Sequence, residues 1–167
     1  MKNFVLFVFL LVPSLSNGQN KNNELIGKYQ NYFGSHIQIN EDSTFSYSWH
    51  FDLMSSWSKG RWSIKNDTLY LKTIPIYDTL SYTDKTGKMV DSLVLSDDDK
   101  PERVTTPNFI GMLSAGGQNR QACPDKLFYD GEKLFGITKQ GRLIKEKLMG
   151  FWSKQKWVPW YFKEIEK

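Results

Sequence analysis

Hydrophobic and polar positions alternate most regularly in residues 60–71, on both sides of Asn66-Asp67. Asn and Asp tolerate the positive φ angles that a two-residue hairpin turn requires. A turn at this point pairs the apolar residues of the two strands, Ile64 with Leu69 and Trp62 with Leu71. Because side chains alternate along a strand, these partners share one face, and we predict a β-hairpin with that face buried.

A second hairpin is predicted around Glu41-Asp42-Ser43, between residues 36–40 and 44–51. A three-residue loop there again matches the apolar positions of the two strands, Ile39 with Phe45 and Ile37 with Tyr47. We expect residues 52–58 to form the connection to the hairpin described above. Beyond that hairpin the chain should continue extended through Pro75, which suits an edge strand or a bulge.

Short alternating runs continue on either side of an irregular segment. Residues 81–96 are expected to form a strand pair around Asp84-Lys85-Thr86-Gly87. Residues 97–124 contain three prolines and no sustained period. Further strands are expected at residues 126–129, 134–137, 142–145 and 160–165. About nine or ten short strands at this spacing predict an all-β fold, an antiparallel barrel or sandwich.

The first 18 residues have the pattern of a cleaved secretory signal. Lys2 gives a positive start, residues 4–12 are uniformly apolar, and Ser16 and Gly18 are placed like the residues that a signal peptidase reads. The apolar run is well short of the roughly 20 residues that span a bilayer, which disfavours an uncleaved anchor. We therefore expect an exported protein, periplasmic or secreted. Residues 19–167 are expected to form one β domain with an irregular insertion at about 97–124.

Chain length, net charge and cysteine content limit the classes of function that this protein can have. Removing the signal leaves 149 residues and, because Lys2 goes with it, lowers the net charge from +4 to +3. This mild charge predicts no nucleic-acid partner. A domain of this size can bury about 70 % of its unfolded surface, so it needs no disulfide, and the single Cys123 cannot form an internal one. Aromatic residues make up 15 % of the chain, which favours strands over helices.

Three short motifs resemble small exported lipocalin-like domains (calycin type) of Gram-negative bacteria. They are Gly27-Lys28-Tyr29, Asn40-Glu41-Asp42-Ser43-Thr44-Phe45 and the segment from Lys59 to Leu69. In that family a Gly-x-Trp or Gly-x-Tyr first strand precedes an acidic turn and a Gly-x-Trp hairpin. The resemblance covers residues 24–72 and implies an up-and-down β-barrel without catalytic residues. Tyr29 stands where Trp is common, and the 97–124 segment has no counterpart.

A barrel of this kind can hold a small apolar molecule. Six residues that alternate inward are expected to line its interior: Trp49, Phe51, Trp62, Ile64, Leu69 and Leu71. The predicted function is therefore non-catalytic binding of a hydrophobic ligand, without a cofactor. The same residues equally describe a filled core, since small barrels often pack solid. The alternative is then a protein-interaction or structural module of the cell envelope that uses the 97–124 loop and the aromatic C-terminal tail.

The tail mixes aromatic and basic side chains. Trp152, Trp157 and Trp160 suit a membrane surface, a glycan or a protein partner, because Trp combines an apolar body with a polar tip. The alternative, favoured by how often aromatic rings dominate core burial, is that about half of the rings in residues 152–163 close the core as the last strand.

Other candidate chemistry is sparse. His36 and His50 fall diagonally on one hairpin face, near enough to share a metal, but no third ligand lies nearby in sequence, and solvated histidines are the simpler interpretation. Cys123 has Asp125 beside it and no local cation, which predicts an inert, partly buried thiol. Asp97-Asp98-Asp99 lacks the glycine of a calcium loop and predicts a solvated turn. No hydrolase, phosphate-binding or zinc-protease motif occurs, so we predict no enzyme.

Overall fold

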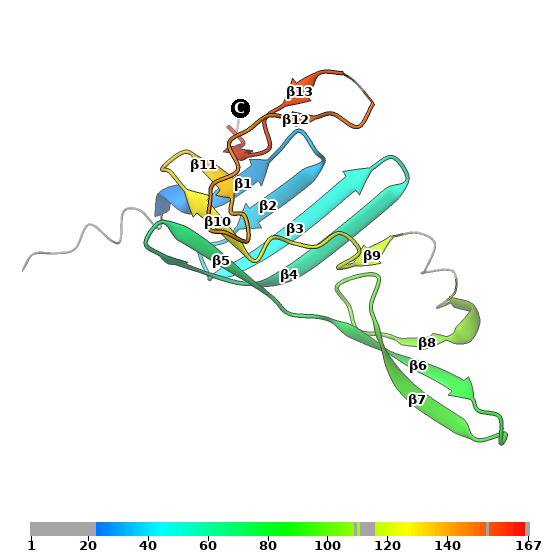
Figure 1. Ribbon diagram of the computed structural model, residues 1–167. Coiled ribbons are helices and arrows are strands. Elements are labelled where there is room, and N and C mark those ends of the chain that lie inside the picture. Colours follow the sequence, from blue (N-terminus) through cyan, green and yellow to red (C-terminus); the bar gives the residue numbers. More distant parts are fainter. Residues whose placement is uncertain (1–22, 109, 111–115, 153, 166–167) are drawn as a thin grey trace, which may run out of the picture.

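The computed structural model describes residues 23–108, 110, 116–152 and 154–165 (Figure 1). The expected signal, residues 1–18, lies outside them. In this part of the chain no helix is long and apolar enough to cross a bilayer. The strands are β1 (Gly27–Gln30), β2 (Ser35–Ile39), β3 (Thr44–Phe51), β4 (Met54–Lys65), β5 (Thr68–Thr73), β6 (Tyr77–Thr83), β7 (Met89–Leu95), β8 (Arg103–Thr105), β9 (Gly117–Gln118), β10 (Lys126–Tyr129), β11 (Lys133–Gly136), β12 (Leu148–Met149), β13 (Lys156–Trp157) and β14 (Tyr161–Lys163).

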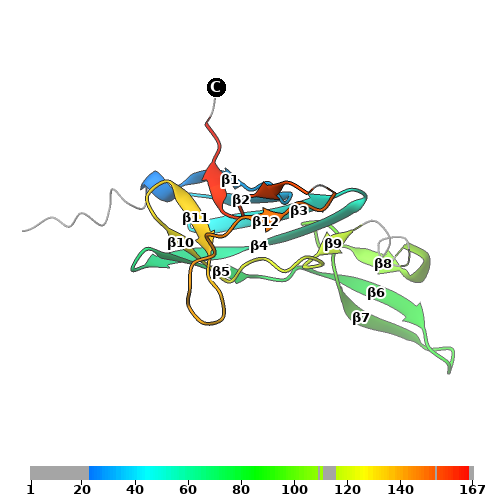
Figure 2. The same cartoon turned by 45° about the horizontal axis from the view of Figure 1, so that its top comes forward.

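Eight of these strands close into an antiparallel barrel. They follow one another in the order β3-β2-β1-β14-β11-β10-β5-β4, and β4 pairs with β3 to complete the ring. β14 lies between β1 and β11, where Tyr29 pairs with Lys163 and Leu134 with Tyr161 (Figure 2). The predicted all-β antiparallel barrel is thereby confirmed. Its closed, eight-stranded form is compatible with a lipocalin-like barrel.

Both predicted hairpins form with the predicted register. The apolar pairs are Trp62 with Leu71, Ile64 with Leu69, Ile37 with Tyr47 and Ile39 with Phe45. Asn66 and Asp67 have φ angles of 49° and 58°, as a two-residue hairpin turn requires. In the longer loop Ser43 takes a φ of 64°. Asp42 fixes that loop by accepting hydrogen bonds from the Thr44 amide (3.0 Å) and hydroxyl (2.6 Å).

The prediction that residues 52–58 form a connection is wrong. Only Asp52-Leu53 turn between β3 and β4, and β4 then runs on to Lys65. The inward positions at the start of β4 are Ser56 and Ser58, so a hydrophobicity pattern does not reveal the strand. Both serines are buried, because residues 119–121 supply hydrogen-bond partners to their hydroxyls.

The surroundings of Gly60 explain why the Gly-x-Trp motif of β4 begins with a glycine. A Cβ at this position would lie 2.0 Å from the Lys72 carbonyl oxygen and 2.9 Å from the Phe45 ring. Real Cβ atoms essentially never approach neighbours so closely. The glycine therefore lets the buried Phe45 ring and strand β5 approach β4 from two sides.

The irregular segment 97–124 contains two short strands that the sequence does not reveal. β8 pairs in parallel with β6, and β9 pairs in parallel with the first half of β4. Gln118 in β9 clamps the chain, because its side-chain amide both accepts from and donates to the backbone of Ile76 at 2.9 Å. Strands β6, β7 and β8 form a separate three-stranded sheet that projects from the barrel (Figure 1). We call it the arm.

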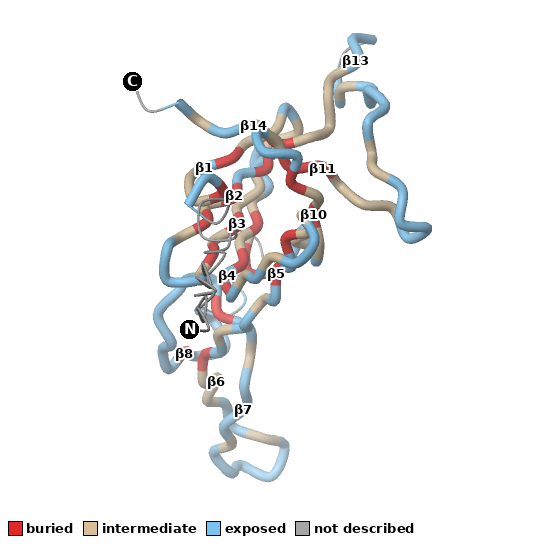
Figure 3. Tube along the Cα trace, turned by 90° about the vertical axis from the view of Figure 1, so that its left-hand side faces the viewer, coloured by how far each residue is buried: buried red, intermediate tan, exposed pale blue. Residues whose placement is uncertain are grey.

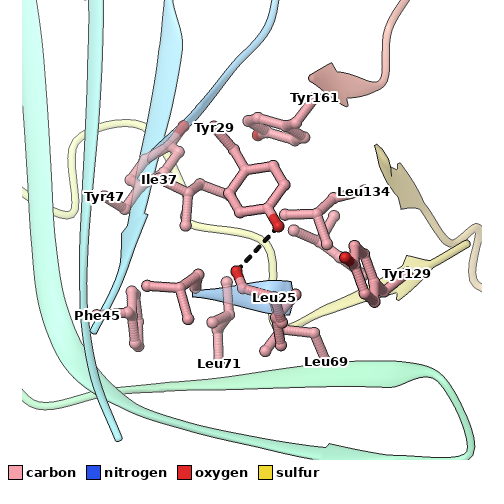
Figure 4. Packing of buried hydrophobic residues seen from close by; sticks show 12 residues of the cluster. Leu25, Tyr29, Ile37, Phe45, Tyr47, Leu69, Leu71, Tyr129, Leu134 and Tyr161 are labelled. Carbon is pink, nitrogen blue, oxygen red and sulfur yellow. Dashed lines mark hydrogen bonds between the residues drawn. The ribbon is translucent and has the colours of Figure 1, made fainter. Parts of the chain in front are cut away.

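The core lies inside the barrel (Figure 3). The Tyr29 ring is fully buried, and its hydroxyl donates to the Leu25 carbonyl oxygen at 2.9 Å (Figure 4). Leu25 belongs to the helical turn 23–25, at the end of the barrel where β1 begins. The buried cluster contains Leu25, Tyr29, Ile37, Ile39, Phe45, Tyr47, Leu69, Leu71, Leu127, Tyr129, Leu134 and Tyr161.

Candidate functional site

Large apolar side chains gather at the end of the barrel where β3 turns into β4. They come from residues 31–34 between β1 and β2, from the β3–β4 hairpin and from the β12–β13 hairpin. We call this surface the aromatic rim. Its members are Tyr32, Phe33, Trp49, Phe51, Leu53, Met54, Leu148, Met149, Phe151, Trp152 and Trp157.

The β12–β13 hairpin carries the longest apolar stretch of the rim. Its strands pair Leu148 with Trp157 and Met149 with Lys156. The Gly150 amide donates to the Gln155 carbonyl at 3.0 Å and closes the loop. Phe151 and Trp152 therefore stand at the tip of the hairpin. A tip would ordinarily carry polar turn residues, so these two rings need a separate explanation.

Ring contacts fix this hairpin against the barrel. The Phe51 and Phe151 ring centroids are 4.1 Å apart, and Phe51 stacks on Trp152 at 5.9 Å with an interplanar angle of 14°. On the other side Tyr32 packs on Trp157 at 4.8 Å. Aromatic pairs at such distances contribute about 0.5–1.5 kcal/mol each beyond their burial. These ring contacts attach the hairpin to the barrel, since among the described strands β12 and β13 form a separate two-stranded sheet.

A second layer connects the rim to the core. Trp49 stacks on Phe51 with 6.2 Å between centroids, and the Trp49 indole donates to the Phe33 carbonyl at 3.0 Å. Trp49 itself packs against the buried cluster. The Phe33 ring in turn meets Phe151 edge-on at 6.0 Å. The rim therefore continues the hydrophobic core outward.

The outermost members of the rim are open to solvent. Leu53 is 89 % exposed and Trp152 is 86 % exposed, whereas most Leu and Trp side chains are largely buried. Behind them, more than half of the surface of Met54, Met149 and Phe151 is exposed. Exposed apolar side chains gathered at one end of the barrel make this surface a candidate interaction site.

The charge around the rim is positive. Lys145, Lys147, Lys154 and Lys156 border the β12–β13 hairpin and are exposed, and the acids nearby in sequence are Glu146 and Asp52. In the described part of the chain no carboxylate forms an ion pair with these lysines. Lys145 lies 5.4 Å from the centre of the Phe135 ring. The other three ammonium groups are free to meet an external anion.

Known proteins give no assignment for this surface. Comparison with family models, with curated proteins and with solved structures finds no match to this chain. What the structure itself shows is a closed eight-stranded barrel, which is compatible with a lipocalin-like fold.

The six residues expected to line the interior fall into three groups. The groups are the buried Leu69 and Leu71, the partly buried Trp49, Trp62 and Ile64 that pack against the core, and Phe51 in the rim. The tail is also divided, because Tyr161 is buried in the core while Trp152 is exposed. Trp157 packs on Tyr32, and Trp160 packs on Phe135 at 5.5 Å.

Sequence reasoning missed much of the rim. Leu53 and Met54 were expected in a connection, and Phe151 was given no role. The available signal was a leucine in the two-residue turn Asp52-Leu53, where small polar residues are usual. A second signal was the apolar run 148–152 with lysines on both sides.

The two histidines lie exposed on the outer face of β2 and β3. His36 Nδ1 is 3.7 Å from Glu164 Oε1, and no group of three or more His, Cys, Asp or Glu side chains within the described ranges could hold a metal ion. Cys123 packs against the core, and burial together with the Asp125 carboxylate raises the pKa of its thiol to about 12. This thiol stays protonated at neutral pH, as an inert cysteine should.

Two hollows of the described surface lie on the outside of the barrel. One of about 310 Å³ is lined by Trp57, Lys59 and the exposed turn Asp97-Asp98-Asp99, and the Asp97 carbonyl accepts a hydrogen bond from the Trp57 indole at 2.6 Å. Lys59 forms an ion pair with Asp99. A second hollow of about 300 Å³ is lined by Lys28, His36 and Glu164, among others.

Proposed function

We propose that this protein is a non-catalytic binding protein whose binding surface is the aromatic rim. The observation that carries the proposal is that exposed apolar side chains at two hairpin tips are joined to the core by ring packing. Leu53 and Trp152 are almost fully exposed, while Trp152 stacks on Phe51, and Phe51 stacks on the Trp49 ring that packs against the core. A surface that is already ordered costs little entropy when a partner binds.

The interior of the barrel supports this choice. Side chains from strands around the whole barrel, including Tyr29 of β1, Phe45 of β3 and Tyr129 of β10, meet in one buried cluster (Figure 4). An eight-stranded barrel is just wide enough for side chains to fill it. A partner would then bind to the apolar side chains that lie outside the core.

The proposal includes export to the periplasm or out of the cell. It is supported by the signal pattern of residues 1–18 and by the resemblance to exported lipocalin-like domains of Gram-negative bacteria. A closed antiparallel barrel is compatible with that family.

Three exposed methionines allow a direct test. Met54 and Met149 belong to the rim and are 56 % and 54 % exposed, whereas Met89 lies on the arm and is 67 % exposed. Exposed thioethers oxidise readily to sulfoxides. We expect a short oxidant pulse applied to the cells that make the protein to oxidise Met54 and Met149 several-fold more slowly than in the purified protein. Peptide mass spectrometry reads all three sites at once.

Met89 is the matched control, because its rate should be the same in cells and in solution. Equal oxidation of Met54, Met149 and Met89 in both settings would show that nothing covers the rim and would end the proposal.

A second candidate function is the one predicted first from the sequence, a small apolar ligand held by the barrel. It is favoured by the partial burial of Trp49, Trp62 and Ile64, which pack against the core without being closed into it. Native mass spectrometry of protein purified from its own cells separates the two candidates. We expect the mass of the polypeptide alone. A mass excess that organic extraction removes would instead make the protein a carrier and identify its cargo.

A further inference from the structure

We infer that the aromatic rim docks on an anionic lipid membrane. This inference rests on the proposed function and adds the chemistry of the partner. Two hairpin tips, Asp52-Leu53 and Phe151-Trp152, stand side by side because Phe51 contacts both Phe151 and Trp152. They carry the apolar groups that would enter the boundary between headgroups and acyl chains.

The kinds of side chain at these tips suit that boundary. Leu53 offers an aliphatic group to the acyl region, and Trp152 offers an indole, which concentrates at membrane interfaces. Met54, Met149 and Phe151 lie behind them and widen the apolar surface.

The lysines that border the aromatic rim favour a membrane over a protein as the partner. Lys147 and Lys154 flank the apolar tip of the β12–β13 hairpin, and Lys156 pairs across the strands with Met149. Lysine is depleted in the buried centre of protein–protein interfaces. At a membrane the same arrangement is favourable, since long lysine side chains reach back to headgroups while their neighbours insert. Free ammonium groups that border exposed apolar tips therefore favour anionic lipid.

The arm provides an internal comparison. It also exposes large apolar side chains, among them Met89 and Leu93. Residues 77–105 contain seven acidic and four basic side chains, so the arm is negative and would be repelled by an anionic surface. Apolar exposure and positive charge thus coincide at the rim and not on the arm.

The test uses the chain expected after cleavage of the signal, residues 19–167, and vesicles of phosphatidylcholine, alone or with one quarter phosphatidylglycerol, in a sedimentation assay at low and high salt. We expect about 100-fold stronger partitioning onto the anionic vesicles, weakened by salt. The pair Leu53→Ser and Trp152→Ser should reduce partitioning by about 10–100-fold. Changing Lys147, Lys154 and Lys156 to Gln should reduce it by about 100-fold, at roughly fivefold per lysine.

Matched variants on the arm control for the loss of apolar or positive groups as such. They are Tyr77→Ser with Leu93→Ser, and Lys85, Lys88 and Lys100 changed to Gln, all at exposed positions. These variants should partition within about twofold of the original protein, because charges beyond a Debye length of about 8 Å are screened. All variants share the same N-terminus, Gln19, so a difference between them reports on the replaced side chains. Circular dichroism verifies that each is folded.

The outcomes separate this inference from the proposed function. Equal binding to neutral and anionic vesicles, or equal losses in rim and arm variants, overturns the inference. Absence of vesicle binding while Met54 and Met149 stay protected in cells also overturns it, and leaves the rim as a site for a protein. Absence of both vesicle binding and protection removes the proposed function as well.

Discussion

Replacing Tyr29 by alanine is expected to lower the free energy of unfolding by about 3–5 kcal/mol, a large part of the 5–15 kcal/mol that is usual for a domain. The ring is fully buried in the core, so its removal leaves a cavity. Its hydroxyl also holds the Leu25 carbonyl at 2.9 Å. Urea denaturation followed by circular dichroism measures the change.

Two further variants divide this effect into its parts. Tyr29→Phe keeps the ring and removes only the hydrogen bond to Leu25, which should cost about 1–2 kcal/mol. Tyr70→Ala removes an exposed tyrosine from the outer face of β5 and should change stability by about 0.5 kcal/mol. A loss in Tyr29→Ala no greater than that in Tyr70→Ala would show that the interior is not packed as described.

Alkaline pH is expected to unfold the protein steeply. Burial raises the pKa of the Tyr29, Tyr47 and Tyr161 phenols above the usual 10, and burial with Asp125 raises the pKa of the Cys123 thiol to about 12. The unfolded chain therefore releases these protons at lower pH than the folded protein does. Stability is fully present below about pH 9 and falls above it, by up to about 1.4 kcal/mol per pH unit for each group.

Each of these groups contributes at most about 1.4 kcal/mol per pH unit, so the free energy of unfolding falls more and more steeply as the pH rises through 10. Denaturation curves at a series of pH values measure this slope. Tyr29→Phe removes one of the groups and should make the slope shallower by up to about 1.4 kcal/mol per pH unit. Stability that stays constant up to pH 11 would contradict the burial of the phenols.

The sequence predicts the parts of the fold that local rules determine. Asn66-Asp67 dictates a turn type, the turn type dictates a register, and the register places Trp62 and Leu71 on one face. The same rules fail where inward residues are small. The inward positions in the first half of β4 are Ser56 and Ser58, so the hydrophobicity pattern does not indicate a strand there. The residues that allow these serines to be buried, by hydrogen-bonding their hydroxyls, lie at 119–121.

The proposed binding surface was predictable only in part, for a related reason. The mixture of Trp and Lys in residues 152–163 left an interface open as the alternative to core packing, and in the structure Tyr161 is buried whereas Trp152 is exposed. Sequence patterns do not reveal that Phe151 meets Phe51, because that contact depends on how the closed barrel positions two hairpins far apart in the chain. In the alternative function the segment 97–124 would contact a partner, and the structure adds that Gln118 within it hydrogen-bonds the backbone of Ile76.

The position of β14 between β1 and β11 has a consequence for biosynthesis. The first barrel strand has no partner on one side until the last one has been made, since Tyr29 pairs with Lys163. A nascent chain therefore carries two unpaired strand edges, and contacts so distant in sequence form slowly. The ring can close only after β14 has been synthesised. A chain that crosses a membrane unfolded and assembles afterwards would lose nothing by this delay, whereas premature release of a chain lacking β14 would leave both edges open to aggregation.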